Sequence, residues 1–192
     1  LSESNQFTVN VALVAGVYDY SGGWPDLPGV KDDLDTVSAL LSSKGFSVER
    51  ADNLTKEEFQ ARFDRFLSEY SQEPRARILV YYAGHGHTLT ENGEKEGYIV
   101  LADATNPAKD KEGFKRGSIP MTLFSGKASE INAPQVLFIF DSCFSGSVFS
   151  MMRSIPELAL ELLQKPTRQF ITSGTENQMV PDVSVFRRRF LY

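Results

Sequence analysis

The chain has 192 residues, and the usual domain size of about 150 residues favours one domain over two. Apolar residues make up 41% of the chain and charged residues 23%, which is ordinary globular usage and excludes a disordered or fibrous chain. Twenty basic residues stand against 25 acidic ones, for a net charge of -5. Because the two signs are interspersed, nothing favours a nucleic-acid partner or an anionic membrane surface.

Cys143 is the only cysteine, so the chain cannot form an internal disulfide, and a reducing, cytoplasmic location is expected. The apolar runs 9–17 and 136–140 are too short to cross a bilayer, and residues 1–8 lack the pattern of a signal peptide. The sequence begins without Met and ends inside an amphipathic stretch. We therefore expect a fragment of a longer polypeptide.

In the first half of the chain, predicted strands alternate with predicted helices. The β-branched run 9–16 ends in Gly and is typical of a strand buried on both faces. A loop rich in Gly and Pro leads to a helix over 31–44 with apolar residues at helical spacing, and a strand follows over 46–50. Thr55 and Glu58 form a capping box, which predicts a helix that extends to Tyr70.

The second half continues the alternation. In chain order, we expect a strand over 77–82, a tight turn at 91–94, a strand over 97–101, a polar loop over 106–118, a weakly helical stretch over 120–131, a strand over 136–140, a helix over 155–163, a strand over 169–172 and a helix from 184 onward. This order predicts an α/β fold, with a mostly parallel central sheet covered by helices on both faces. Ligand sites in such sheets lie beyond the carboxyl ends of the strands.

Two polar motifs follow strands at that edge. Cys143 follows the most apolar strand after Asp141 and a serine, and small residues after it let the chain turn sharply. A lone cysteine is most often a small buried hydrophobe, but the polar flanks here favour a reactive thiol. His85 follows the strand 77–82 and has Gly84 and Gly86 on either side, which suits an imidazole beside an oxyanion-binding amide. A loop histidine with one hydrogen bond is the alternative.

Other chemistries lack their residues. His85 and His87 could share a metal, but no third ligand stands at a recognisable spacing, so no metal is expected. A phosphatase loop needs an arginine soon after the cysteine, whereas the first one downstream is Arg153. The phosphate-binding, dinucleotide-binding and serine-hydrolase glycine motifs do not occur.

Together, residues 81–86 (Tyr-Tyr-Ala-Gly-His-Gly) and residues 138–146 (Phe-Ile-Phe-Asp-Ser-Cys-Phe-Ser-Gly) resemble the metacaspase and orthocaspase branch of the caspase-like cysteine peptidases. Residues 27–33 are similar to the Gly-Cys-x-Asn-Asp stretch of that branch, although Val30 replaces its cysteine and Phe144 a frequent histidine. The resemblance implies the caspase-hemoglobinase fold as a single peptidase domain over 1–192. The large-subunit region would cover about 1–150, with a linker and the start of the small-subunit region over about 151–192.

The residues and the resemblance together predict a cysteine endopeptidase with a Cys143–His85 dyad. Cys143 would attack the peptide carbonyl, His85 would act as base and acid, and the N–H groups of Gly86 and Cys143 would hold the oxyanion. If Asp33 and Asp141 both face the first substrate pocket, the pocket is anionic and favours Arg or Lys at P1. For Asp33 the alternative is a carboxylate that complements a helix dipole, and Asp32 could take its place.

The expected partners are protein or peptide substrates with Arg or Lys at P1, with regulatory domains or partner proteins beyond this sequence left open. No cofactor is expected, and the departures at Val30 and Phe144 weaken any claim of calcium activation. Arg153 is the candidate site of self-cleavage, although the segment around it could be a plain surface connection. The alternative functions are a catalytically silent caspase-like interaction domain and a cysteine hydrolase of another specificity.

Overall fold

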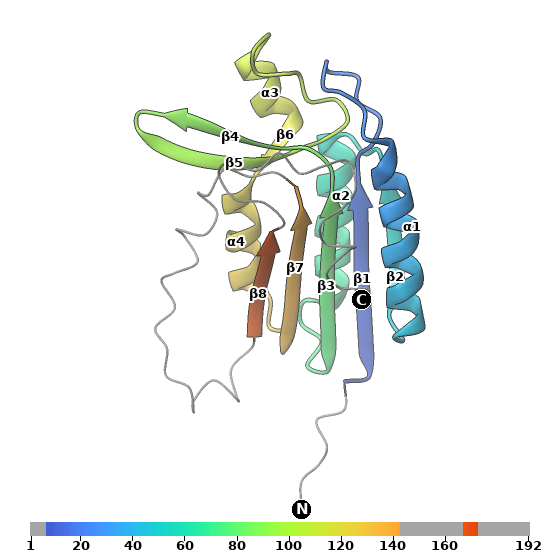
Figure 1. The fold of residues 1–192 in the computed structure, drawn as a ribbon. Helices are drawn as coiled ribbons and strands as arrows, with labels where there is room; N and C mark the ends of the chain where they lie inside the picture. Colours follow the sequence, from blue (N-terminus) through green and yellow to red (C-terminus); the bar gives the residue numbers. More distant parts are fainter. Residues whose placement is uncertain (1–6, 143–166, 173–192) are drawn as a thin grey trace, which may run out of the picture.

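The computed structural model describes residues 7–142 and 167–172 of the chain. Within them, five strands form a central sheet in the order β2-β1-β3-β7-β8, and every neighbouring pair is parallel (Figure 1). The strands are β1 (Val9–Gly16), β2 (Ser47–Asp52), β3 (Ala76–Ala83), β7 (Gln135–Asp141) and β8 (Thr167–Thr172). The predicted parallel α/β sheet is therefore confirmed.

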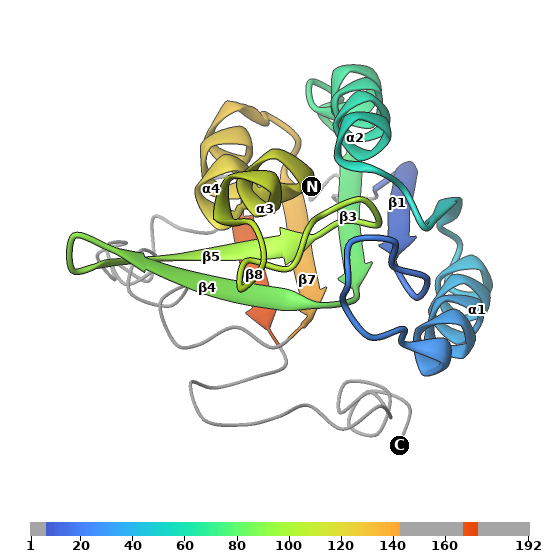
Figure 2. The same cartoon turned by 90° about the horizontal axis from the view of Figure 1, so that it is seen from above.

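Helices cover both faces of the sheet, with α1 (Pro28–Ser43) on one face and α2 (Lys56–Tyr70) and α4 (Met121–Glu130) on the other (Figure 2). Because strand side chains alternate, β1 serves both layers. Ala12 and Val14 belong to the apolar cluster under α1, whereas Leu13 belongs to the cluster under α2 and α4. None of the helices in the described residues is long and apolar enough to cross a membrane.

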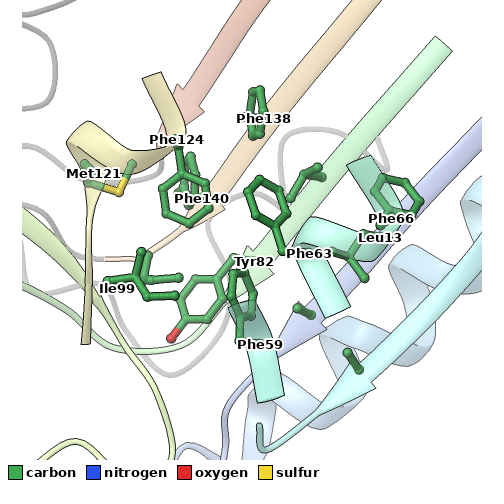
Figure 3. Close-up of a cluster of buried hydrophobic side chains, with 14 of the residues drawn as sticks. Leu13, Phe59, Phe63, Phe66, Tyr82, Ile99, Met121, Phe124, Phe138 and Phe140 are labelled. Atoms are coloured by element: carbon green, nitrogen blue, oxygen red, sulfur yellow. The ribbon is translucent and has the colours of Figure 1, made fainter. Parts of the chain in front are cut away.

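Aromatic side chains fill the layer between the sheet and the helices α2 and α4 (Figure 3). Phe63 of α2 meets Phe124 of α4 with ring centroids 5.4 Å apart, and Phe124 meets Phe140 of β7 at 4.9 Å, both edge to face. Phe59 also packs edge-on against Tyr82 of β3. These tilted ring pairs add to the apolar burial and fix the carboxyl halves of β3 and β7 against the helices.

A small antiparallel sheet of β4 (Gly86–Glu91), β5 (Glu94–Val100) and β6 (Ser118–Pro120) lies at the carboxyl end of the central strands (Figure 1). The β4–β5 hairpin turns at Asn92 and Gly93, which both have positive φ, at 52° and 84°. A two-residue Asn-Gly turn of this kind matches the twist of a hairpin. The tight turn was predicted from the sequence, but β4 before it was not.

One predicted helix start and one predicted loop need correction. The helix expected from residue 31 begins at Pro28, because proline suits the first helical position, where its missing N–H is not needed. The expected polar loop over 106–118 is wrong, since it contains the helix α3 (Lys111–Gly117). The Asp110 carboxylate caps α3 by accepting the N–H of Gly113 at 2.9 Å. The helices expected over 155–163 and from 184 lie outside the described residues.

The capping box at the start of α2 is present as predicted: Thr55 Oγ1 accepts the N–H of Glu58, and the Glu58 carboxylate accepts the N–H of Thr55. Thr55→Ala removes the hydroxyl that satisfies the helix terminus, so we expect the free energy of unfolding to fall by about 1 kcal/mol in urea denaturation. Thr55→Ser keeps a capping hydroxyl and should stay close to wild type. An equal loss in both variants would contradict a role for the cap.

Candidate active site

The register between β3 and β7 brings the two predicted motifs to one edge of the sheet. Ala83, the last residue of β3, lies opposite Asp141, the last residue of β7, and the N–H of Gly84 donates to the Asp141 carbonyl at 3.4 Å. His85 follows directly after Gly84. Cys143 comes two residues after Asp141 in the sequence; it and Arg153 lie outside the described residues.

Hydrogen bonds to its backbone and to its ring hold His85 at this edge. Its backbone N–H donates to the Tyr20 hydroxyl at 2.8 Å, and its carbonyl accepts the N–H of Val100 at 3.0 Å. The imidazole Nε2 lies 2.8 Å from the carbonyl oxygen of Pro25. The β1–α1 loop therefore fixes both the backbone and the ring of His85, and the strand β5 fixes its backbone carbonyl.

The Pro25 contact selects one form of the imidazole. A carbonyl oxygen can only accept a hydrogen bond, so Nε2 carries the proton, and Nδ1 is then the acceptor in the neutral ring. Burial lowers the pKa of His85 below its ordinary value, while the hydrogen bond to Pro25 raises it in part. A lowered pKa keeps the ring neutral at pH 7, as a proton acceptor must be.

Gly84 is required by a close approach of two side chains. Its φ is +154°, and a Cβ atom built there would lie 2.7 Å from the Tyr82 hydroxyl and 2.8 Å from the Tyr20 hydroxyl. The glycine thus lets Tyr20 reach the backbone of His85 beside Tyr82, whose hydroxyl donates to the Val100 carbonyl at 2.6 Å. Gly86, the predicted oxyanion residue, opens β4 opposite Ile99.

Asp33 and Asp141 both act on the hydroxyl of Tyr81. Asp33 is 5% exposed and Asp141 is 8% exposed, so both carboxylates are buried. The Tyr81 hydroxyl donates to Asp141 Oδ2 at 3.2 Å. Burial first, and then the charges of Asp141 and Asp33, raise the pKa of Tyr81 well above its ordinary value. Both acidic residues of the predicted pocket thus influence the same hydroxyl, and their role in binding substrate stays a prediction.

The earlier start of α1 changes the reading of Asp33. Since the helix begins at Pro28, Asp33 lies in its second turn, and the first turn contains no acidic residue. The fields of a helix dipole fall off within the first turn, so the dipole explanation for Asp33 loses its basis. Asp32, the alternative pocket residue, is exposed.

His87 lies in an aromatic environment. Its ring packs edge-on against Trp24 at 5.7 Å and against Phe114 at 5.2 Å between centroids, and burial lowers its pKa. Among the residues that the structure describes, no three His, Cys, Asp or Glu side chains are grouped in a way that could hold a metal ion. Tyr20, Trp24 and Pro25 were missed as site residues from the sequence, which signalled only a loop there.

The described residues define a protein of the α/β class whose candidate site lies beyond the carboxyl ends of parallel strands, with one fixed imidazole and two buried carboxylates. The family model of the caspase domain matches residues 9–183, which is most of the chain. The chain therefore belongs to the caspase domain family of cysteine peptidases. The narrower metacaspase and orthocaspase branch stays a prediction.

Solved structures share this fold. Protein GSU0716 from Geobacter sulfurreducens is 18% identical, with a TM-score of 0.55 over 76% of this chain and 54% of its own. The Drosophila initiator caspase Dronc is 15% identical, with a TM-score of 0.52 over 80% of this chain and 53% of its own. The chain thus spans about half the length of each. No curated protein sequence matches it.

The close approach at Gly84 can be tested by stability. Gly84→Ala should lower the free energy of unfolding by about 3 kcal/mol, because the new methyl group combines an unfavourable φ with overlap against Tyr20 and Tyr82. Gly45 is a matched control: its φ is +83°, and no atom lies within 4 Å of a Cβ built there. Gly45→Ala should therefore lose only about 1 kcal/mol. Equal losses in urea denaturation would contradict the contact.

Proposed function

We propose that this domain is a cysteine endopeptidase in which Cys143 is the nucleophile and His85 the general base, acting on proteins or peptides after Arg or Lys. The observation that carries the proposal is the fixed His85 imidazole, whose Nε2 binds the Pro25 carbonyl at the edge of the sheet. The strand β7 ends at the same edge, two residues before Cys143 in the sequence. A thiol is only a minor fraction thiolate at neutral pH, so the nucleophile needs such a base.

In the proposed reaction, the Cys143 thiol gives its proton to Nδ1 of His85, and the sulfur attacks the carbonyl carbon of the scissile peptide bond. The N–H groups of Gly86 and Cys143 stabilise the oxyanion that forms. As the tetrahedral intermediate collapses, the C–N bond breaks, and the imidazolium gives its proton to the leaving amine. Water then hydrolyses the thioester, which restores the thiol and releases the acid.

The acidic pair supports the basic P1 preference. Asp33 and Asp141 are both buried, and both act on the Tyr81 hydroxyl, which supports their assignment to one anionic pocket. A guanidinium or ammonium group offsets two carboxylates, whereas an acidic P1 side chain is repelled by them. No other candidate function is favoured by a specific contact in the described residues.

The dyad is tested by two variants on a P1-Arg peptide. Cys143→Ala should abolish turnover because the nucleophile is gone, and His85→Ala should lower kcat by about 10²- to 10⁴-fold because general acid–base catalysis is lost. His85→Ala should also slow alkylation of Cys143 by iodoacetamide at neutral pH. Turnover retained by Cys143→Ala would overturn the mechanism. A wild-type protein that neither turns over nor labels with P1-Arg or P1-Asp probes would favour the silent interaction domain.

The proposed pocket is tested by replacing each acidic residue with asparagine, with the exposed neighbour Asp32 as the control. Asp33→Asn and Asp141→Asn should each lower kcat/KM on P1-Arg peptides by about 30-fold, or about 2 kcal/mol, because one partner of a buried charge pair is lost. On P1-neutral peptides the loss should be small. Asp32→Asn removes the same charge from an exposed position one residue away and should leave both activities unchanged. Equal losses on both peptides would assign the two carboxylates to structural support.

A further inference from the structure

The only tryptophan of the chain and its two histidines meet in one cluster. Trp24, in the loop between β1 and α1, packs against His85 at 5.2 Å between ring centroids, with an interplanar angle of 35°. It packs against His87 at 5.7 Å and against Phe114 at 6.1 Å. Tyr20 from the same loop also contacts the imidazole of His85, at 4.8 Å.

No hydrogen bond explains where the indole lies. Trp24 Nε1 is buried and has no hydrogen-bond partner among the described residues. A buried N–H without a partner is unfavourable, so the position of the indole has to be stabilised by its ring contacts. Of these contacts, the two histidines and Phe114 are the rings that surround it.

The segment that carries Trp24 is itself fixed. Ser21 donates its N–H to the Ala102 carbonyl at 3.0 Å, and the Gly22 carbonyl accepts the N–H of Asn106 at 2.9 Å. The loop backbone also lies so close to the 102–106 segment that a Cβ on Gly22 would come within 1.9 Å of the Ala104 carbonyl oxygen. Trp24 is therefore presented from an anchored backbone.

Trp24 and Pro25 act on the same imidazole from adjacent positions. The Pro25 carbonyl fixes the direction of Nε2, but one hydrogen bond leaves the ring free to tilt about that contact. The indole, packed at a low angle against the imidazole, restricts that tilt. The Pro25 hydrogen bond and the Trp24 ring contact together hold the proton-accepting atom of the imidazole in one direction, as a general base requires.

We propose that Trp24 is a positioning residue for His85: its indole packs against the imidazole and, together with the Pro25 carbonyl, keeps the proton-accepting Nδ1 in one direction. This inference rests on the proposed function, in which His85 is the base. Among the described residues, the Tyr20 and Tyr82 hydroxyls bond the backbone of His85, Asp26 accepts the N–H of Tyr20, and His87 packs on Trp24. Burial raises the pKa of both tyrosines, so they stay neutral over the physiological range.

The decisive measurement does not need activity. In full-length protein carrying Cys143→Ala, each histidine is followed by NMR pH titration, and the His85→Ala and His87→Ala variants assign the two resonances. Trp24→Ala removes part of the burial that lowers the pKa of His85, so that pKa should rise toward its ordinary value of about 6.5. Trp24→Phe restores an aromatic face and should return the pKa toward that of the wild type. An unchanged His85 pKa in Trp24→Ala would overturn the proposal.

The kinetic arm separates positioning from packing. Trp24→Ala should lower kcat on a P1-Arg peptide by about 10- to 100-fold, move the acid limb of its pH profile to higher pH, and recover with Trp24→Phe. Tyr98→Ala, which removes another half-buried ring of the same cluster that packs on Phe114, should leave kcat unchanged. Equal kcat losses in Trp24→Ala and Tyr98→Ala, without recovery by Trp24→Phe, would overturn the proposal. A wild-type protein without turnover but with the NMR shift would refute the peptidase and support the contact.

Discussion

The parallel pairing of β3 with β7 is the constraint on which the candidate site depends. The register that sets Ala83 opposite Asp141 makes both strands end at the same level of the sheet. Both strands are buried on both faces in their carboxyl halves, so a slip of one residue would send every core side chain to the wrong layer. The packing of Phe140 against Phe124 therefore also fixes which residues leave the sheet at the site edge.

The two adjacent tyrosines near the end of β3 show how one strand serves two parts of the site. Side chains alternate along a strand, so Tyr81 points into the layer under α1 and Tyr82 into the layer under α2. In the first layer, the Tyr81 hydroxyl binds Asp141 beside Asp33. In the second, the Tyr82 hydroxyl binds the Val100 carbonyl and fixes β5 next to His85. Contacts of Asp141 and of the strand next to His85 are thus made from opposite faces of a single strand.

The sequence predicted the central sheet because buried parallel strands are apolar runs, and it predicted α2 because a capping box is a local pattern. It missed α3, since this helix is short and contains two glycines, and its local signal was only the capping carboxylate of Asp110. It also missed β4, whose polar residues follow His85 directly. Trp24 and Pro25 had no signal at all, because their contacts with His85 depend on the path of a loop anchored far away in the chain.

The proposed P1 specificity and the proposed base depend on the different surroundings of the two carboxylates and of the imidazole. Asp33 and Asp141 are two buried carboxyl groups whose charges both act on the Tyr81 hydroxyl. In the proposed function, a P1 arginine would supply a cation that two carboxylates favour. His85 lies among aromatic rings and a carbonyl, where burial disfavours the imidazolium. The imidazole therefore remains neutral, as the base of the proposed reaction has to be.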